Sequence, residues 1–343
     1  MSDVVDAQES SVPLLDIDDL VVTYRARRRA AREGQPRVIA VDGLSLKVSP
    51  GESLGVVGES GSGKSTLARA VVGLVRPTAG EILFRGRSLT RANRRELREL
   101  RRHIQMVFQD PYGSVNPRFT VDDVVSEPLE NYHPERNARQ RRERVADLLA
   151  RVHLPSELAD RPVEGLSGGQ LQRVGVARAL ALNPHLVVAD EPMSALDVSI
   201  QASVLNLLGD LKRTEGISYL FITHNLAVAQ HIADRVAVVY GGRVMEQGDG
   251  DDVIRSPLHP YTKELLAAVP GVRLRQSVGD KTRPRAQPVV GGVGCPYASR
   301  CPLATEVCTT VRPPLEAKRP GRLVACHHVA VEDVVRRDNG KRP

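Results

Sequence analysis

Apolar and polar residues alternate along two segments near the start of the chain. Residues 14–24 (LLDIDDLVVTY) and 38–48 (VIAVDGLSLKV) repeat with a period of two, which predicts strands with one buried face. Residues 53–57 (SLGVV) are almost uniformly apolar, as is typical of a parallel strand buried on both faces. Helical spacing follows and is predicted to end at Pro77. The apolar face of that predicted helix consists of Leu67, Ala70, Val71, Leu74 and Val75.

The middle of the chain changes from strand patterns to helical ones and back. Residues 120–165 are polar and charged, with one amphipathic stretch formed by Val145, Leu148, Leu149 and Val152, which predicts a helical insertion. Strand-like runs then occur at 186–189, 219–223 and 235–240. The helical segments QLQRVGVARALAL and SIQASVLNLLGDL lie between them. This alternation predicts an α/β fold with a parallel sheet covered on both faces.

The C-terminal part of the chain has a different amino-acid composition. Residues 271–292 are rich in Gly, Pro and Arg, which predicts a linker. We therefore expect one domain over 14–270, with its helical part at about 110–168. An extension over 271–330 and a disordered tail over 331–343 would follow.

Composition and charge limit where the chain can act. No apolar run reaches the roughly 18–20 residues that span a bilayer, and the first residues lack the pattern of a secretory signal. These features predict a cytosolic protein unless a partner holds it at a membrane. The net charge is +7, and the clearest basic run is Arg25, Arg27, Arg28, Arg29 and Arg32. A solvated hairpin loop is the favoured interpretation of this run, with contact to lipid headgroups as the alternative.

A phosphate-binding motif follows the buried strand. Residues 58–65 (GESGSGKS) match G-x-x-x-x-G-K-[ST] between a predicted strand and a predicted helix. The glycines let backbone N–H groups face a phosphate, and the helix directs its positive end at the same anion. Lys64 would reach the β- and γ-phosphates, and the Ser65 hydroxyl would bind Mg²⁺. The expected nucleotide-binding residues are Gly58, Ser60, Gly61, Gly63, Lys64, Ser65 and Thr66.

Two carboxylates end the strand at 186–189. Asp190 is in a position suited to Mg²⁺ binding, and Glu191 to polarising an attacking water as a general base. An ordinary acidic turn after a strand is the alternative interpretation, which the upstream P-loop disfavours.

Residues 166–170 (LSGGQ) resemble the signature of ABC ATPases. Other positions match that family in order: Gln109 resembles the Q-loop glutamine, residues 194–197 the D-loop, His224 the switch histidine, and Tyr24 the aromatic residue that stacks on adenine. The resemblance covers nearly the whole chain. It implies a P-loop (RecA-like) ATPase core with helical and antiparallel β subdomains. It also implies an ATP hydrolase in which Glu191, His224 and Gln109 are catalytic and Ser65, Gln109 and Asp190 bind Mg²⁺. Further nucleotide contacts would come from Tyr24, Ser167, Gly168, Gly169, Gln170 and Asp197.

The resemblance also implies an assembly. In the family, the signature of one subunit closes on ATP held by the P-loop of another. The segments QDPYGSVNPR (109–118) and HPYTKELLAAVP (259–270) resemble ATP-binding subunits of oligopeptide and dipeptide importers of the "F" type. The implied partners are two transmembrane permease subunits, a second ATPase of the "D" type and, indirectly, an extracytoplasmic solute-binding protein. The implied location is the cytoplasmic face of the membrane. Residues 162–165 (PVEG) depart from the aromatic-Pro-His-Glu run that often precedes the signature.

All four cysteines lie in the extension, at Cys295, Cys301, Cys308 and Cys326. Disulfides are disfavoured in a cytosolic protein, and the usual C-x₂₋₄-C pairs of a zinc site are missing. The importer resemblance implies a [4Fe–4S] cluster, with zinc or reduced thiols as alternatives.

Other functions compete with peptide import. A nickel or other solute importer shares many of these motifs, and an ABC ATPase acting on nucleic acid would suit the basic charge. The single P-loop, the short insertion and the lack of aromatic residues among the basic ones argue against nucleic acid. The extension argues against an exporter. The sequence therefore predicts the ATPase subunit of an importer that takes up peptides.

Overall fold

A computed structural model describes residues 12–25, 37–194, 196–268 and 290–331. The basic residues of segment 26–36, the linker over 271–289 and the tail from residue 332 therefore lie outside the described residues. The D-loop residue Ala195 lies outside them as well.

The larger sheet has eight strands in the described part of the chain, in the order β11-β12-β10-β9-β3-β8-β7-β6. Neighbours from β9 to β6 are parallel, whereas β10, β12 and β11 add to one edge in antiparallel fashion. The parallel strands are β3 (Ser53–Val57), β6 (Ile104–Val107), β7 (Leu186–Asp190), β8 (Ser218–Thr223) and β9 (Arg235–Tyr240). The others are β10 (Arg243–Asp249), β11 (Glu316–Arg319) and β12 (Arg322–Val324). The predicted buried parallel strands are confirmed, since every residue of β3, β7 and β8 is buried.

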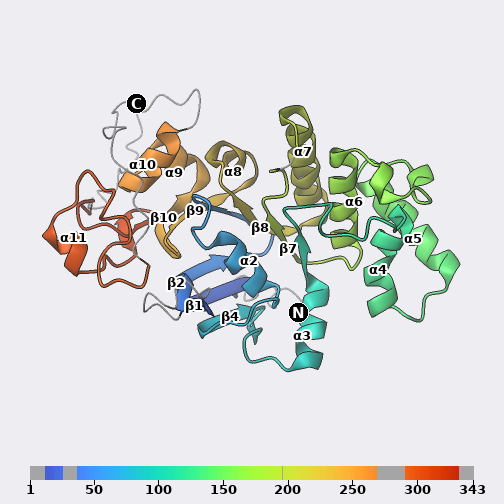
Figure 1. Cartoon of the computed structure of the whole chain (residues 1–343), viewed down its shortest axis with the longest axis horizontal. Coiled ribbons are helices and arrows are strands. Elements are labelled where there is room, and N and C mark those ends of the chain that lie inside the picture. The colour runs from blue at the N-terminus through green and yellow to red at the C-terminus, as the bar shows by residue number, and fades with distance from the viewer. Residues whose placement is uncertain (1–11, 26–36, 195, 269–289, 332–343) are drawn as a thin grey trace, which may run out of the picture.

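A smaller antiparallel sheet packs against the larger one (Figure 1). Its order is β2-β1-β4-β5, with β1 at Leu15–Arg25, β2 at Arg37–Val48, β4 at Ala79–Phe84 and β5 at Arg87–Ser88. The predicted alternation is confirmed in β2, where Leu44, Leu46 and Val48 are buried between more exposed neighbours. These residues form one apolar cluster with helix α2 (Lys64–Val71) and the larger sheet. The helix after the P-loop therefore lies between the two sheets.

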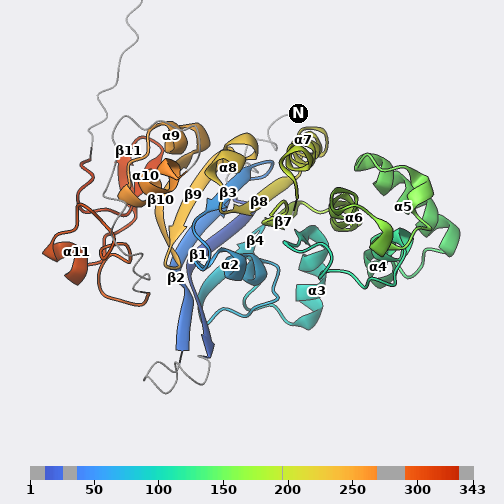
Figure 2. The same cartoon turned by 45° about the horizontal axis from the view of Figure 1, so that its top comes forward.

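A helical lobe lies on the side of the molecule away from the C-terminal extension (Figures 1 and 2). It contains α4 (Val121–Tyr132), α5 (Ala138–Arg151) and α6 (Gly168–Leu180), with short 3₁₀ turns at Ser156–Leu158 and Val163–Gly165. The predicted apolar face of the insertion is confirmed, because Val145, Leu148, Leu149 and Val152 are fully buried. Helix α7 (Val198–Glu215) joins this cluster, and α3 (Arg94–His103) precedes β6.

Helix α8 (Leu226–Ile232) packs on β3 and β8 in the middle of the larger sheet. Toward the other end of the sheet lie α9 (Gly250–Arg255), α10 (Pro260–Ala267) and, in the extension, α11 (Glu306–Thr310). Tyr240, Tyr261 and Tyr297 are buried together there. Strand β12 of the extension pairs with β10. The extension is thus continuous with the larger sheet.

Helix α2 is shorter than the sequence predicts. It ends at Val71, so Leu74 and Val75 are not part of it and Leu74 is exposed. Gly73 has a φ of 71°, a left-handed conformation that ends the helix. Arg101 of α3 donates to the carbonyl oxygens of Val72 and Gly73 (3.0 and 2.6 Å). These contacts satisfy acceptors at the helix end.

In the described part of the chain, no helix is both long and apolar enough to cross a bilayer.

Candidate nucleotide-binding and catalytic site

The P-loop joins the end of β3 to the start of α2. A Cβ at Gly58 would lie 2.1 Å from the carbonyl oxygen of Val239. Gly63 has a φ of 101°, and a Cβ there would lie 2.2 Å from the carbonyl oxygen of Ala40. Only glycine fits at either position. The turn that leads into α2 therefore depends on these two glycines.

Lys64 lies inside this loop with 4% of its surface exposed. Its Nζ donates to the carbonyl oxygens of Gly58 (2.8 Å) and Glu59 (2.9 Å), with Ser62 Oγ at 3.4 Å. Burial lowers the pKa of Lys64, whereas the nearby carboxylates of Glu191, Asp190 and Glu59 oppose that shift. The ammonium group is thus held at the centre of the predicted phosphate site.

Ser65 and Asp190 meet across the site. Ser65 Oγ donates to Asp190 Oδ1 at 3.0 Å, and Asp190 is 2% exposed at the end of β7. Burial raises the pKa of Asp190, and the Ser65 hydrogen bond opposes that rise. A hydroxyl and a carboxylate in contact are oxygen ligands of the kind that Mg²⁺ takes beside nucleotide phosphates. The two residues fit the predicted ion.

Glu191 contacts both of the other residues predicted to be catalytic. His224 Nδ1 lies 3.1 Å from Glu191 Oε2, and Gln109 Nε2 donates to the same oxygen at 3.4 Å. Glu191 has a φ of 44°, which a non-glycine residue rarely adopts. The structure therefore brings Gln109, Glu191 and His224 together, next to the Ser65–Asp190 contact.

Tyr24 is near the same site at the end of β1. Its hydroxyl lies 3.4 Å from Thr66 Oγ1 of α2, where the tyrosine is the donor. Tyr24 is 39% exposed, so a ligand can reach this residue. Thr66 and Tyr24 therefore lie together, as the resemblance implies.

The signature begins helix α6 in the helical lobe. Ser167 is the N-cap: its hydroxyl accepts from the Gln170 N–H (3.3 Å), and Gln170 Oε1 accepts from the Ser167 N–H (3.0 Å). A Cβ on Gly169 would lie 2.6 Å from Cγ2 of Ile200, so the glycine permits close packing on α7. In both views α6 is set apart from α2 (Figures 1 and 2). The signature and the P-loop of one chain thus belong to different lobes.

The sequence does not reveal the residue that holds the D-loop. Gln201 Nε2 donates to the carbonyl oxygens of Met193 (3.1 Å) and Leu196 (2.9 Å). It thereby fixes the turn between Glu191 and Asp197, which is the N-cap residue of α7. A glutamine inside a helical pattern carries no signal for such a role.

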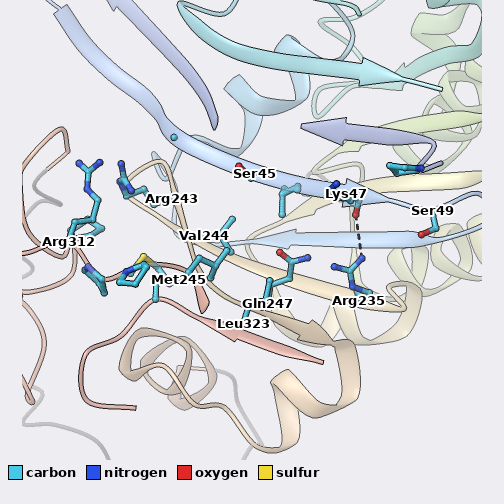
Figure 3. Close-up of a pocket in the computed structure, with 18 of the residues that line it drawn as sticks. Ser45, Lys47, Ser49, Arg235, Arg243, Val244, Met245, Gln247, Arg312 and Leu323 are labelled. Carbon is cyan, nitrogen blue, oxygen red and sulfur yellow. Dashed lines mark hydrogen bonds between the residues drawn. The ribbon is translucent and has the colours of Figure 1, made fainter. Parts of the chain in front are cut away.

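A cavity of about 950 Å³ lies elsewhere, between β2, β10 and the extension (Figure 3). It contains none of the predicted nucleotide-binding residues. Its four basic side chains, Lys47, Arg235, Arg243 and Arg312, are all paired with carboxylates. These pairings distinguish it from an open triphosphate site.

The prediction of an iron–sulfur cluster is wrong. Within residues 290–331 and the other described ranges, no group of three or more His, Cys, Asp and Glu side chains is placed to hold a metal ion. Cys295 and Cys301 pack against one apolar cluster and Cys326 belongs to another, with Leu258 and Val324.

The cysteines are free thiols. Burial raises the pKa of Cys295 to about 11 and also raises that of Cys301. The Cys308 sulfur contacts His328 Nε2 at 3.4 Å. Reduced thiols, one of the alternatives for the cysteines, agree with these observations.

Comparison with known proteins finds family matches for two parts of the chain. Residues 41–194 match the ABC transporter family model, and residues 245–308 match that of the oligopeptide/dipeptide transporter C-terminal region. The oligopeptide transport ATP-binding protein OppF of Salmonella typhimurium is 46% identical over 88% of this chain and 92% of its own. The oligopeptide transport ATP-binding protein AppF of Bacillus subtilis is 44% identical over 92% of this chain and 97% of its own.

Solved structures agree with these matches. A dimeric bacterial ABC transporter cassette superposes with a TM-score of 0.61 at 30% identity, covering 68% of this chain and 98% of that one. The same holds for a post-hydrolysis dimer bound to ADP and phosphate. The predicted fold and ATPase class are confirmed, and the chain belongs to the ABC transporter ATPase family, in the group that carries an oligopeptide/dipeptide transporter C-terminal region.

Proposed function

We propose that this chain is the ATP-hydrolysing subunit of an importer of dipeptides or oligopeptides. One observation carries the catalytic part: Gln109, Glu191 and His224 meet beside Ser65 and Asp190 at the P-loop. The peptide substrate is supported by the C-terminal match and by the relatives named for oligopeptide transport. A nickel or other solute stays the alternative within the same class.

The proposed binding step uses the P-loop and β1. Backbone N–H groups of residues 58–66 would bind the phosphates at the positive end of α2. Lys64 would exchange its carbonyl contacts for β- and γ-phosphate oxygens, and Tyr24 would stack on adenine. Ser65 and Asp190, with Gln109, would hold Mg²⁺, which neutralises phosphate charge when bound.

The proposed hydrolysis step uses Glu191. Its carboxylate accepts a proton from the attacking water. His224 contacts the same carboxylate oxygen and would orient it toward the γ-phosphate. Gln109 would report the presence of nucleotide to the permease through the adjoining loop.

The proposed assembly follows from the separation of the two lobes. Because α6 is set apart from α2, the signature residues Ser167, Gly168, Gly169 and Gln170, with Asp197, would close on ATP held by a second ATPase subunit. We infer a related "D"-type chain in that place. Two permease subunits, served by a solute-binding protein, would hold the pair at the cytoplasmic face of the membrane. The division into a 14–270 domain and a 271–330 extension remains part of this proposal.

The test is Glu191→Gln in the purified complex. Removing the general base should lower kcat for ATP by about 10²–10⁴-fold while ATP binding persists, so ATP should trap the ATPase subunits in the closed dimer. Glu99→Gln, on the exposed surface of α3, is the matched control and should leave kcat unchanged. Retained hydrolysis, or subunits that stay dissociated in ATP, would contradict the assignment. Uptake of a labelled hexapeptide and of Ni²⁺ into proteoliposomes would decide between the two solutes.

A further inference from the structure

An arginine of the C-terminal extension reaches the P-loop. Arg300 donates from Nη1 to Glu59 Oε2 at 2.8 Å and from Nη2 to Glu59 Oε1 at 3.0 Å. Glu59 is the second residue of the P-loop, 241 positions earlier in the chain. A bidentate pair of this kind fixes both position and orientation of the carboxylate.

The Arg300 guanidinium is also held by contacts other than the one to Glu59. The Arg300 side chain is 7% exposed and also pairs with Glu264 of α10. Its Cζ lies 5.6 Å from the ring centroid of Tyr240 and 5.8 Å from that of Tyr297, within the range of cation–π attraction. The hydrogen bond to Glu59 and the neighbouring carboxylates raise the pKa of Arg300, so its charge is permanent.

The backbone of Glu59 is held from the same side. Its N–H donates to the hydroxyl of Tyr261 at 2.9 Å. Tyr261 is fully buried in α10 and packs against Tyr240 and Tyr297, with ring centroids 4.6 and 5.4 Å away. The side chain of Glu59 is therefore held by Arg300 of the extension, and its main chain by Tyr261 of α10.

Glu59 affects the phosphate site in two ways, through its carbonyl oxygen and through the charge of its carboxylate. Its carbonyl oxygen accepts from Lys64 Nζ at 2.9 Å, so Glu59 is part of the loop that places the phosphate-binding lysine. Its carboxylate is also a negative charge close to where a triphosphate would lie. Unpaired, that charge would repel the phosphates, and paired with Arg300 it is neutralised.

We propose that Arg300 is a positioning residue for ATP, through which the C-terminal extension sets the shape and charge of the P-loop. The inference rests on the proposed binding of ATP at residues 58–66. It gives the extension a role in nucleotide affinity that is separate from the cysteines.

The test is Arg300→Met in the assembled complex, with Kd measured for a fluorescent ATP analogue and KM and kcat for ATP. We expect Kd and KM to rise about tenfold, the equivalent of about 1.4 kcal/mol, with kcat at saturating ATP changed less than about twofold. Adding Glu59→Gln to Arg300→Met removes the unpaired charge at the P-loop and should return KM to within about threefold of wild type. Arg255→Met, at an exposed arginine of α9, is the matched control and should change nothing.

An unchanged KM in Arg300→Met would overturn the proposal. So would a raised KM that Glu59→Gln does not lower, because that result assigns Arg300 to packing alone. If Arg300→Met fails to fold, Arg300→Lys keeps the charge without the fork and should show a smaller rise in KM. In that case a KM equal to wild type in Arg300→Lys would overturn the role of the bidentate contact. Failure of the wild-type complex to bind the analogue would instead contradict the proposed function.

Discussion

At the scale of single residues, the site depends on backbone conformations that only a few side chains accept. Glu191 keeps a φ of 44° although it is not glycine, at a cost on the order of 1 kcal/mol. Its N–H donates to the carbonyl oxygen of Ile222 at 2.9 Å and its carbonyl oxygen accepts from the Ser194 N–H at 3.2 Å. These bonds hold the strained turn that presents the carboxylate to His224.

A buried histidine makes stability depend on pH. His259 is 1% exposed and is the N-cap of α10, where its Nδ1 accepts from the Tyr261 N–H at 3.0 Å. Burial lowers the pKa of His259 to about 3 from an ordinary value of 6.5. Below pH 6.5 His259 therefore binds a proton in the unfolded chain but not in the folded one. The stabilisation is complete above pH 6.5 and declines as pH falls toward 3.

We expect the free energy of unfolding to drop by about 1.4 kcal/mol more in wild type than in His259→Asn between pH 7.5 and pH 5.5. Asparagine can still cap the helix but does not titrate. Urea unfolding at the two pH values measures the difference. Parallel pH profiles for the two proteins would contradict this assignment.

At the scale of elements, the apolar pattern predicted the strands that are buried on both faces. It did not predict strand β10, because that strand contains several polar residues. Strand β10 has the sequence RVMEQGD, yet Glu246 is fully buried within it. Its carboxylate accepts from the N–H groups of Leu258 and His259, both at 2.9 Å, and pairs with Arg322, 76 positions later. A reading based on periodicity assigns such a residue to the surface, because its partners are remote in sequence.

The packing of α6 against α7 depends on a glycine of the signature, Gly169. Gly169→Ala would place a Cβ 2.6 Å from Ile200 Cγ2 and should push the start of α6 away from α7. We expect ATPase activity of the complex to fall about tenfold or more, while ATP binding to the isolated chain is unchanged because the P-loop is untouched. Steady-state ATPase assays and an ATP-analogue titration measure the two effects.

The same helix provides the control. Gly175 has no atom within 4 Å of a built Cβ, so Gly175→Ala should keep activity. Ile200→Ala should restore part of the activity lost in Gly169→Ala. Full activity of Gly169→Ala would show that α6 need not approach α7 so closely.

At the scale of the whole molecule, contiguous motifs were predictable and contacts between distant segments were not. The P-loop and the Asp190–Glu191 pair are short strings whose chemistry can be read directly. Their convergence with Gln109 and His224 needed the family's order of motifs as a guide. No feature of the sequence indicates that Arg300 pairs with Glu59, or that β12 joins the sheet beside β10. The four clustered cysteines misled the prediction, because within the described ranges their side chains form no group placed to hold a metal ion.

Asp42 connects three parts of the molecule. It lies in β2 of the smaller sheet and pairs with Arg243 of β10 at 2.9 Å and with Arg312 of the extension at 3.3 Å. Burial raises the pKa of Asp42, but the hydrogen bond and charge of Arg243 and the charge of Arg312 outweigh it, so the pKa lies below 3.8. The carboxylate therefore stays charged, and its stabilisation is lost only when pH falls below about 4.

Asp42→Asn should lower the free energy of unfolding by about 1–2 kcal/mol, because two guanidinium groups lose the carboxylate that they share. Asp16→Asn in β1 removes a pair with the exposed Lys47 and should change stability by less than about 0.5 kcal/mol. Both are measured by urea unfolding at pH 7. Since Arg312 belongs to the extension, Asp42→Asn should also speed limited proteolysis within residues 290–331. Equal stability and equal cleavage in the two variants would mean that the smaller sheet and the extension are joined by packing around the cavity, and that the charges there are incidental.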